Sequence, residues 1–427
     1  MRRTKDSNLA WIGAIPEDWS VLRGKNVVKK LKRPVKETDG VITCFRDGEV
    51  TLRSKRREEG FTFSDLEVGY QGIEPGDLVI HGMDGFAGAI GVSDSRGKGT
   101  PVLNVLDSKY DKRYLMYYFR TIAKCGYFES VATGIRVRTC DTNWNKISVT
   151  PCLVPSLSEQ SRIAVFLDER CGKIDEAIAK HKALIEKLDE YRKAVITKAV
   201  TKGVKGERKM KESGVVWIKE IPSDWTYKPL KAIFSFGKGL SITKANLVEK
   251  GFPVISYGQV HAKYNSGVSV CDELIRYVSK EDICEASLVN KNDLIFADTS
   301  EDLEGCGNCV YVDTDYPIYG GYHTIVLNSR SKQNNKFIAY LVKTDDWRFQ
   351  LRRQLTEVKL YSVSQKVLKD TTVILPTPTE QQEIVAYLDE KCAAIDAAKE
   401  HHAQLITKLE EYKKSLIYNA VTGKIEC

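Results

Sequence analysis

The sequence predicts an α+β protein in which two domains of mixed helix and strand are joined by two long, paired helices, the whole arranged as an internal repeat. Two observations support this. Residues 153–204 and 375–426 align without a gap through a long helical pattern, and Glu159 of the first copy corresponds to Glu380 of the second. A shorter segment, Trp11–Trp19, which we call the opener, returns as Trp217–Trp225. The chain therefore consists of two repeats, each made of an opener, a domain of mixed helix and strand that we call the body, and a long helix.

Each long repeat has the start and stop signals of one helix. The segments Ser156–Glu159 and Thr377–Glu380 match the capping box, in which a hydroxyl and a carboxylate satisfy each other's free backbone donors. Pro378 suits the first helical turn. Gly203 and Gly423 supply the residue that ends such a helix. We therefore expect each repeat to form a single helix.

Both helices carry a stripe of residues in strict 4-3 spacing, which is the pattern of a coiled-coil seam. The seam residues are Leu167, Cys171, Ile174, Ile178, His181, Ile185, Leu188, Arg192 and Val195 in the first helix, and Leu388, Cys392, Ile395, Lys399, His402, Ile406, Leu409, Lys413 and Leu416 in the second. So narrow a stripe on a polar helix needs another helix to cover it. A helix that lies on a globular core would carry a wider one. Two matching seams in one chain favour pairing with each other.

The two bodies lie between opener and helix and share little sequence identity. Both contain short runs of β-branched and aromatic residues bounded by turn residues, which predict strands. The predicted strands are Asp77–Ile80, Ala89–Val92, Pro253–Tyr257, Asp293–Phe296, Cys309–Val312 and Thr324–Leu327, and the helical patterns are Asp111–Ala123 and Asn335–Leu355. Each body should therefore be α/β with a mixed or antiparallel sheet. The predicted segments are residues 1–152, 153–204, 205–216 as linker, 217–374 and 375–427. The lysine-rich stretch Lys202–Glu212 is expected to be a solvated connector.

Composition limits the class of protein. The chain has 427 residues, 42% hydrophobic and 29% charged, with a net charge of +8, which permits a polyanionic partner without requiring one. No apolar run reaches membrane-spanning length and the start has no signal-peptide core, so a cytoplasmic protein is expected. Eleven scattered cysteines suit a reducing compartment. Cys306 and Cys309 form the only C-x-x-C, and we expect two small buried residues there rather than a metal site.

Catalytic signatures are missing from the sequence. It contains no phosphate-binding P-loop, no dinucleotide-binding glycine pattern and no Asn-Pro-Pro or Asp-Pro-Pro segment of the adenine methyltransferase type. The histidines have no adjacent nucleophile that would mark a catalytic centre. We therefore expect no catalytic residue and no metal in this chain.

Scattered polar and basic residues of the bodies are suited to nucleic acid. Lys and Arg supply the salt-dependent attraction to phosphates, and polar loop residues can form hydrogen bonds with base edges. The candidates are Arg46, Arg53, Arg56, Lys98, Arg136 and Arg138 in the first body, and Lys238, Lys244, Gln259, His323, Lys359 and Tyr361 in the second. For each single residue a solvated surface position remains the alternative. The acidic segment Thr299–Asp302 would repel phosphate, so it either contacts bases or shapes a loop.

The doubled plan closely resembles the specificity subunit of type I restriction-modification systems. The resemblance rests on the openers Trp-Ile-x-x-Ile-Pro-x-Asp-Trp and on the helix starts at Pro155 and Pro376, which share Pro-x-x-x-Glu-Gln-x-x-Ile-x-x-x-Leu-Asp. The stretches that lead into the helices, Arg136–Ile147 and Lys359–Val373, are also similar to that family. Nearly the full chain is covered, although the family varies its bodies.

The resemblance implies that each body is a target recognition domain for one half of a bipartite, asymmetric site in double-stranded DNA. The helices would form an antiparallel coiled coil that sets the distance between the half-sites. Under this pairing we expect Leu167 near Leu416 and Leu388 near Val195. The seam would also dock partner subunits, with these residues involved: Leu167, Ile174, Ile178, His181, Ile185, Leu188, Leu388, Ile395, His402, Ile406, Leu409 and Leu416.

The expected partners are methyltransferase subunits, two of them by the resemblance, and restriction subunits with translocase activity. S-adenosylmethionine, ATP and Mg²⁺ would be bound by those partners and none of them by this chain. Lys399 and His402 in the second seam depart from a purely apolar pattern. Two other classes of function stay open on the sequence alone: an autonomous DNA-modifying or DNA-cleaving enzyme, and a coiled-coil adaptor that binds only proteins.

Arg136→Ala and Arg138→Ala are expected to weaken DNA affinity more than they alter helix pairing, because alternate residues of an extended segment point the same way toward a ligand. Titration of DNA at several salt concentrations measures the first effect and thermal unfolding the second. Unchanged affinity for both variants at every salt concentration would remove this segment from the interface.

Overall fold

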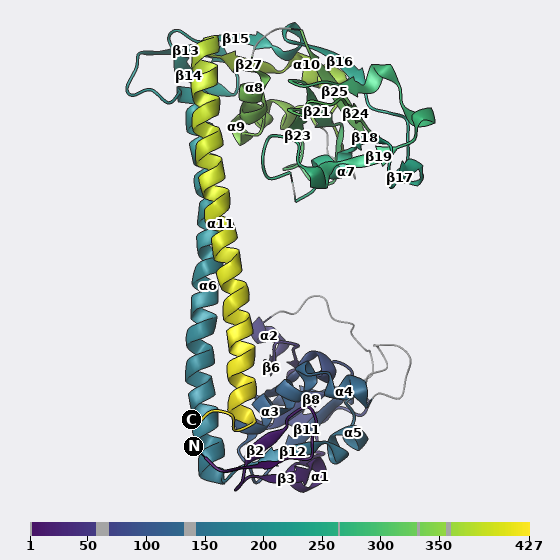
Figure 1. The fold of residues 1–427 in the computed structure, drawn as a ribbon, viewed down its shortest axis with the longest axis vertical. Helices are drawn as coiled ribbons and strands as arrows, with labels where there is room; N and C mark the ends of the chain where they lie inside the picture. Colours follow the sequence, from purple (N-terminus) through teal and green to yellow (C-terminus); the bar gives the residue numbers. More distant parts are fainter. Residues whose placement is uncertain (1, 57–67, 132–141, 264, 331–333, 356–359) are drawn as a thin grey trace. The chain divides into compact units, whose positions relative to one another are not determined.

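The computed structural model describes residues 2–56, 68–131, 142–263, 265–330, 334–355 and 360–427 (Figure 1). The chain divides into two compact units. Unit 1 consists of residues 1–182 and 403–427, and unit 2 of residues 183–402. Helices α6 (Leu157–Lys202) and α11 (Pro378–Val421) each run through both units. Each unit therefore combines one body with the start of one long helix and the end of the other.

Unit 1 is built on a four-stranded antiparallel sheet. Its order is β4 (Lys29–Lys30), β11 (Leu103–Asp107), β8 (Leu78–His81) and β9 (Ile90–Val92). Two-stranded antiparallel pairs surround it: β1 (Thr4–Asp6) with β2 (Ala14–Pro16), β3 (Ser20–Arg23) with β12 (Pro151–Val154), β5 (Ile42–Cys44) with β6 (Val50–Leu52), and β7 (Gln71–Ile73) with β10 (Gly97–Gly99). The helices are α1 (Gly24–Val27), α2 (Arg53–Arg56), η1 (Gly85–Ala87), α3 (Lys112–Lys124), α4 (Tyr127–Ser130) and α5 (Trp144–Val149).

Unit 2 repeats this sheet and adds a second one. The four-stranded antiparallel sheet has the order β16 (Phe234–Lys238), β25 (Thr324–Ser329), β21 (Leu294–Ala297) and β23 (Cys309–Tyr311). The added sheet is mixed, with the order β17 (Leu247–Val248), β19 (Arg276–Val278), β18 (Phe252–Ile255), β24 (Ile318–Gly320) and β20 (Leu288–Val289), and β18 and β24 are parallel. The pairs are β13 (Met210–Val215) with β14 (Ile218–Pro222), β15 (Thr226–Pro229) with β27 (Thr372–Leu375), and β22 (Thr299–Ser300) with β26 (Tyr361–Ser362).

The helices of unit 2 include two, α8 (Asn335–Val342) and α9 (Asp345–Arg352), in the region where the sequence predicts a helical pattern. The others are η3 (Leu230–Ala232), η4 (Lys244–Asn246), α7 (Tyr257–Val260), η5 (Asp272–Leu274), η6 (Lys280–Asp282), η7 (Glu285–Ser287) and α10 (Gln365–Asp370). All six predicted strands are present, and α3 matches the first predicted helix. The helical pattern predicted over Asn335–Leu355 forms two helices, because the Thr344 side chain accepts a hydrogen bond from the Trp347 amide and begins α9 there.

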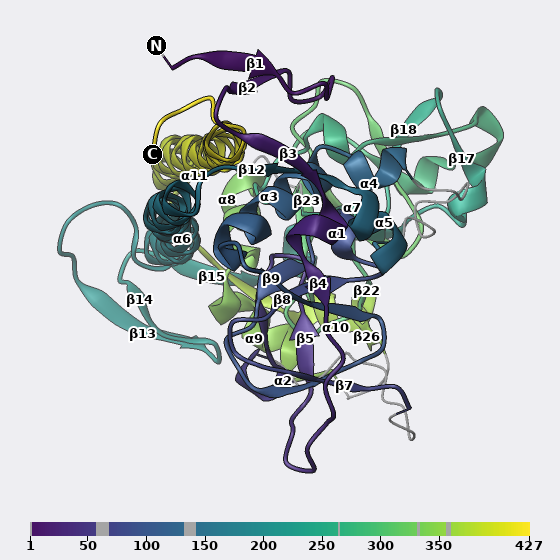
Figure 2. The same ribbon diagram turned by 90° about the horizontal axis from the view of Figure 1, so that it is seen from below.

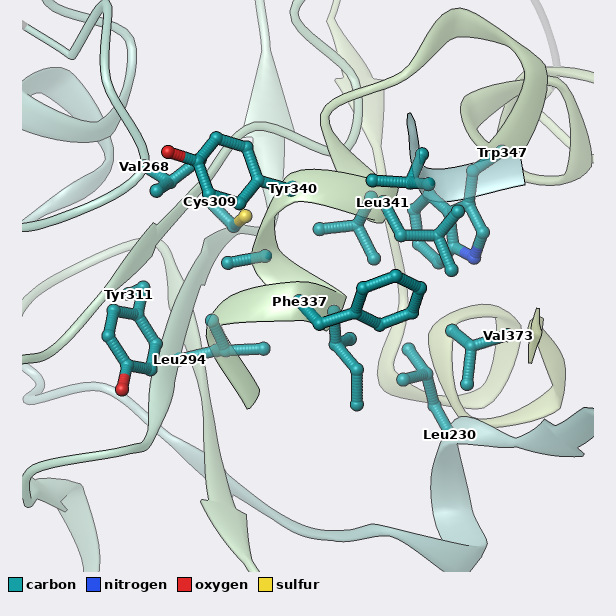
Figure 3. Close-up of a cluster of buried hydrophobic side chains, with 14 of the residues drawn as sticks. Leu230, Val268, Leu294, Cys309, Tyr311, Phe337, Tyr340, Leu341, Trp347 and Val373 are labelled. Atoms are coloured by element: carbon teal, nitrogen blue, oxygen red, sulfur yellow. The ribbon is translucent and has the colours of Figure 1, made fainter. Parts of the chain in front are cut away.

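Each unit has its own apolar core. In unit 2, Phe337, Tyr340 and Leu341 of α8 and Trp347 of α9 pack against strand residues such as Leu294 (Figure 3). In unit 1 the corresponding layer comes from α3 and the four-stranded sheet, and its residues include Tyr114, Tyr118, Phe119, Leu78 and Ile90. Both cores extend onto the ends of the long helices, through Leu167, Cys171, Ala420 and Val421 in unit 1 and Ala199, Val200, Leu388 and Cys392 in unit 2. The long helices are therefore part of each domain and not appendages to it.

Within each unit the two long helices lie side by side and run antiparallel (Figure 1). Ion pairs across the pair fix the direction: Lys413–Asp175 in unit 1, and Lys399–Asp189, Arg192–Asp396 and Lys205–Glu383 in unit 2. The two residue numbers add to the same total in all four pairs, which is the signature of one antiparallel register. Lys399, which interrupts the apolar seam, thus has a carboxylate partner at 2.5 Å on the facing helix.

The register corrects the predicted contacts by about one helical turn. It places Leu167 level with Val421 rather than Leu416, and Leu388 level with Val200 rather than Val195. The sequence shows the spacing within each seam but contains no signal for how far one helix slides along the other. The ion pairs and the contacts at the helix ends decide that.

The seam positions are shielded from solvent, although not equally. Leu167, Cys171, Ile174, Ile178, Arg192, Leu388, Cys392 and Ile395 are buried, and His181, Ile185, Leu188, Val195, Lys399, His402, Ile406, Leu409, Lys413 and Leu416 are half-buried. The stretches nearest the bodies are thus the more buried ones, because each body covers the helices there. The cysteines at seam positions, Cys171 and Cys392, are both free thiols.

A buried carboxylate joins each opener to the helix of the same repeat. Glu380 accepts a hydrogen bond from the Trp225 indole at 2.9 Å and forms an ion pair with Arg208, which also holds Asp224. In unit 1, Glu159 makes the same contacts with the Trp19 indole at 3.1 Å and with Arg2, which holds Asp18. We call each such set of contacts a clamp.

The clamp corrects the expected capping box. The Ser156 and Thr377 hydroxyls do accept hydrogen bonds from the Glu159 and Glu380 amides, both at 3.3 Å. The carboxylates, however, are directed to the indole and guanidinium groups of the clamp. The reason is energetic: a buried carboxylate is stabilised far more by a cation and an indole donor than by one backbone amide.

The connector prediction is also wrong over part of its length. Met210–Val215 pairs with β14 as a hairpin, which corresponds to the β1–β2 hairpin of unit 1. Arg208 occupies a fixed position in the clamp. The structural repeat therefore begins earlier than Trp217, within the lysine-rich stretch whose composition is that of a solvated linker.

Replacement of Glu380 by Gln is expected to lower the free energy of unfolding by about 3 kcal/mol, because it leaves Arg208 without its buried partner. Glu383→Gln is the matched control, since Glu383 lies one turn further along α11 and its partner Lys205 is exposed. Urea unfolding monitored by tryptophan fluorescence measures both variants. Equal midpoints for the two variants would show that the clamp does not stabilise unit 2.

Candidate nucleic-acid interface

The structure brings three of the predicted arginines together in unit 1. Arg46, Arg53 and Arg56 line one hollow of about 690 Å³, with His81 on the opposite strand end. The hollow forms because the β5–β6 hairpin packs against β8, where the Cys44 thiol contacts the Val79 carbonyl, and because α2 continues directly from β6. We call it the arginine hollow.

The three arginines differ in how far they are committed to protein contacts. Arg56 is held by Asp47 and Glu49, and its guanidinium lies 3.9 Å from the centre of the Phe45 ring. Arg53 donates from Nε to Thr43 at 3.0 Å. The Arg46 side chain is 69% exposed, and it forms an ion pair with Asp84 at 2.8 Å. Arg46 is therefore the cation best placed to contact a phosphate from solvent.

His81 is a member of the hollow that sequence reasoning did not select. Its Nδ1 accepts hydrogen bonds from the amides of Met83 and Asp84 at 3.2 and 3.0 Å, so the neutral ring carries its proton on Nε2. Burial lowers the pKa of His81, which favours that neutral form. The sequence did offer one indication that His81 could belong to a site, because it stands at the end of a predicted strand, directly before a glycine-bearing turn.

Several candidates fall elsewhere. Lys98 lies on β10, half-buried, and does not line the hollow. Arg136, Arg138 and Lys359 lie outside the described residues, so their predicted roles remain predictions. The candidates of unit 2 are more dispersed than the arginines of unit 1. Lys238 ends β16 and Lys244 begins η4, and both are exposed.

Gln259 has a structural role in its present position. Its side-chain oxygen accepts a hydrogen bond from the Ser256 amide at 3.2 Å and caps α7. His323 is exposed, with a backbone φ of 53°, and its Nδ1 lies 3.2 Å from an Asp298 oxygen and 3.4 Å from the Thr299 hydroxyl. Tyr361 lies on β26, where it pairs with Ser300 of β22.

His323 belongs to a group of rings that the sequence did not bring to notice. Tyr257 lies 5.4 Å from His323, 5.5 Å from Tyr322 and 6.3 Å from His261 between ring centres. We call these four residues the Tyr–His cluster. Half-exposed aromatic and imidazole rings next to polar loop groups can stack on bases or contact their edges.

The acidic segment shapes a loop beside this cluster. Thr299 and Ser300 form β22, and the Asp302 carboxylate accepts a hydrogen bond from the Gly305 amide. The Thr299 carbonyl also contacts His261 at 2.8 Å. The segment was expected either to contact bases or to shape a loop, and these hydrogen bonds support the second role.

No catalytic or metal centre is apparent in the described part of the chain. Within those residues, no three His, Cys, Asp or Glu side chains are grouped so that they could hold a metal ion. Cys306 and Cys309 are buried, as expected, and burial raises the pKa of both thiols. Among the described helices, none is long and apolar enough to cross a membrane.

The sequence is similar to a known protein family and to several of its members. A family model described as the type I restriction modification DNA specificity domain matches residues 222–411. The MjaVIII specificity subunit of a type I restriction enzyme from Methanocaldococcus jannaschii is 23% identical over 96% of this chain and 94% of its own length. The EcoBI specificity subunit of Escherichia coli is 24% identical over 89% of this chain and 81% of its own.

The chain is a homologue of type I restriction enzyme specificity subunits. Two solved structures share its fold. One, from a study of complex assembly and conformational transition of the type I R-M system, covers 96% of this chain with a TM-score of 0.73 at 14% identity. The other, the HsdS subunit from Thermoanaerobacter tengcongensis, covers 96% of this chain with a TM-score of 0.53, also at 14% identity.

These findings confirm the family and the fold class predicted from the sequence. The fold of this specificity-subunit homologue is two mixed helix–strand units with antiparallel long helices, and the match to residues 222–411 falls on the second body and most of α11. The individual contact residues of the arginine hollow and the Tyr–His cluster are not addressed by the comparisons. They stand as candidates on their geometry.

Arg46→Ala is expected to weaken binding to duplex DNA and to reduce the slope of log Kd against log salt concentration by about one, because one phosphate contact is lost. Arg170→Ala, which removes a cation from α6, serves as the control. Fluorescence anisotropy over a range of salt concentrations measures both variants. A slope identical to that of the unmodified chain would exclude Arg46 from the interface.

Proposed function

We propose that this chain is the non-catalytic DNA sequence-specificity subunit of a type I restriction-modification complex. The observation that carries the proposal is the duplication: two units with the same clamp, the same four-stranded sheet order and the same helix contacts differ in the surface their loops present. A bipartite DNA site requires two recognition surfaces on one rigid framework.

Each body would recognise one half of an asymmetric site. In unit 1 the candidate surface is basic, through the arginine hollow, and in unit 2 it is rich in aromatic and imidazole groups. Arginines contact guanine edges and phosphates, whereas rings stack on bases and polar side chains contact base edges. Two surfaces of different chemistry suit two half-sites of different sequence.

The long helices would bind the partner subunits. Tyr191 and Tyr412 occupy the same position of the repeat, one in each unit, and both are more than half exposed. Exposed aromatic side chains at equivalent positions favour equivalent partners. We infer two methyltransferase subunits, joined by restriction subunits with translocase activity. S-adenosylmethionine, ATP and Mg²⁺ would be bound by those partners.

Two other functions make different predictions. An autonomous nuclease would cleave DNA when the purified chain is incubated with Mg²⁺, so robust cleavage would contradict the proposal. A coiled-coil adaptor that binds only proteins would protect no DNA sequence in a footprint of the chain with its methyltransferase partner. A footprint with two short protected segments supports the specificity function.

Expression of this chain with its methyltransferase partner is expected to produce methylated adenines in one bipartite motif. The physical reason is that two recognition surfaces must be satisfied together before the partner can act. Sequencing of methylated adenines in those cells measures the motif, and cells that express the methyltransferase alone are the control. The same methylation pattern in both cultures would refute the proposal.

A further inference from the structure

Unit 1 contains a cavity that recognition of DNA does not explain. Its volume is about 920 Å³, and its walls come from α3, the start of α6 and the end of α11. Figures 1 and 2 both show α3 beside these helix ends. Asp47 lines both this cavity and the arginine hollow, but Arg46, Arg53, Arg56 and His81 do not line it.

Three carboxylates on the wall already have partners. Asp168 accepts hydrogen bonds from the Tyr117 hydroxyl and the Arg113 guanidinium, both at 2.8 Å. Lys413 binds both oxygens of Asp175, at 2.7 and 2.6 Å. The carboxylate of Asp47 is held by an arginine outside the cavity, Arg56. Asp168 and Asp175 are therefore already paired, whereas Asp47 also attracts Arg120 without forming an ion pair with it.

Four cations on the wall lack such partners. Arg120, Lys124, Lys182 and Lys414 form no hydrogen bond or ion pair with any residue that the structure describes. Burial, followed by repulsion from Arg120, Lys413 and Lys414, lowers the pKa of Lys124, so these charges lie close enough to affect one another. Burial also lowers the pKa of Arg120. Only two unpaired carboxylates, Glu410 and Glu411, face them from the described wall.

The corresponding place in unit 2 shows how the fold satisfies the same positions internally. Tyr340 and Lys336 of α8 bind Asp389 at 2.7 and 2.8 Å, as Tyr117 and Arg113 bind Asp168 in unit 1. One turn later, the Lys343 ammonium donates to the carbonyls of Asn265 and Gly267. Its counterpart in unit 1 is Arg120, which has no such acceptors among the residues that the structure describes.

The space beside these groups also differs between the units. In unit 2 the equivalent cavity is only about 300 Å³, and a guanidinium on its wall, that of Arg348, donates to the Glu304 carbonyl at 3.0 Å and to Asn308 at 2.8 Å. Unit 1 thus keeps a threefold larger cavity and leaves its cations unpaired. Arg120 is half-buried, and a partly buried cation without a partner costs free energy that an anion from outside would recover. Lys124, Lys182 and Lys414 are exposed and add positive charge around it.

We propose that the cavity of unit 1 binds a phosphate-bearing anion of the size of a nucleoside di- or triphosphate. Several converging cations suit a multivalent anion, and lysine and arginine are the side chains that bind phosphate groups. A volume of this size is typical of small-ligand sites. The apolar part of the wall, which includes Met116, Ile417 and Tyr418, offers a surface for a ring attached to the phosphates.

Such a ligand would connect the body of unit 1 to the long helices. Arg120 and Lys124 belong to α3, Lys182 to α6 and Lys414 to α11, so one anion would contact three elements. Binding to the folded state alone stabilises it in proportion to the logarithm of ligand concentration. The proposal does not depend on the DNA-specificity function.

The test is thermal unfolding of the full chain with tripolyphosphate or with ATP. Both are expected to raise the unfolding midpoint of the unmodified chain by several degrees and to leave the Arg120→Met/Lys124→Gln variant unchanged. Without ligand, the variant should unfold at or above the midpoint of the unmodified chain, because it lacks two mutually repelling cations. A larger shift with ATP than with tripolyphosphate indicates a nucleotide, and equal shifts indicate that the phosphate groups alone are recognised.

Two control variants locate the bound anion. Lys193→Gln changes the position in unit 2 that corresponds to Lys414 and should keep the full shift. Arg46→Ala removes a cation of the arginine hollow and should also keep it. The proposal is overturned if neither anion shifts the midpoint, if the shift persists in the double variant, or if Arg46→Ala abolishes it. The last outcome would assign the anion to the DNA interface.

Discussion

The clamp around Glu159 and Glu380 is the contact on which the rest of the structure depends. Each carboxylate stands at the start of a long helix and is bound by an indole of the opener and by a guanidinium that precedes the opener, that of Arg2 or Arg208. The end of the other long helix passes directly beside it. A Cβ at Gly203, whose φ is +79°, would lie 2.8 Å from a Glu380 oxygen. Three segments far apart in the sequence therefore meet at one point in each unit, and their meeting requires the long helices to be antiparallel.

A second constraint is electrostatic. Arg192 and Lys413 occupy the same position of the repeat, and each reaches across to the equivalent aspartate, Asp396 or Asp175. Lys399 adds a pair with Asp189 that has no counterpart, because Ile178 takes the equivalent position in the first helix. Apolar seams alone tolerate sliding by one heptad, whereas misplaced ion pairs leave charges unpaired. The cations in the seam thus set the register that the leucines and isoleucines leave open.

The two units share a common framework but differ in their surface loops and in their cavities. The framework consists of the clamp, the four-stranded sheet and the Tyr–Asp contact between α3 or α8 and a long helix. Unit 2 adds the five-stranded sheet, and its Tyr–His cluster is formed by residues close to that sheet. Unit 1 keeps the arginine hollow and a larger cavity beside α3. Duplication has therefore preserved the contacts that hold body to helix, while loop surfaces and buried charges have diverged.

The sequence by itself determined the duplication, the helices with their start and stop residues, the seam spacing and the family, because these are properties of local order and periodicity. Tertiary structure decided the register of Leu167 and Leu388, the division of Asn335–Leu355 into α8 and α9, and the use of Glu159 and Glu380 as clamp residues rather than as simple caps. It also decided which candidates meet: Arg46, Arg53 and Arg56 meet in unit 1, and the rings around His323 form a separate cluster in unit 2. Such contacts link residues distant in the chain, and no local pattern encodes which partner a buried charge or an exposed ring will find.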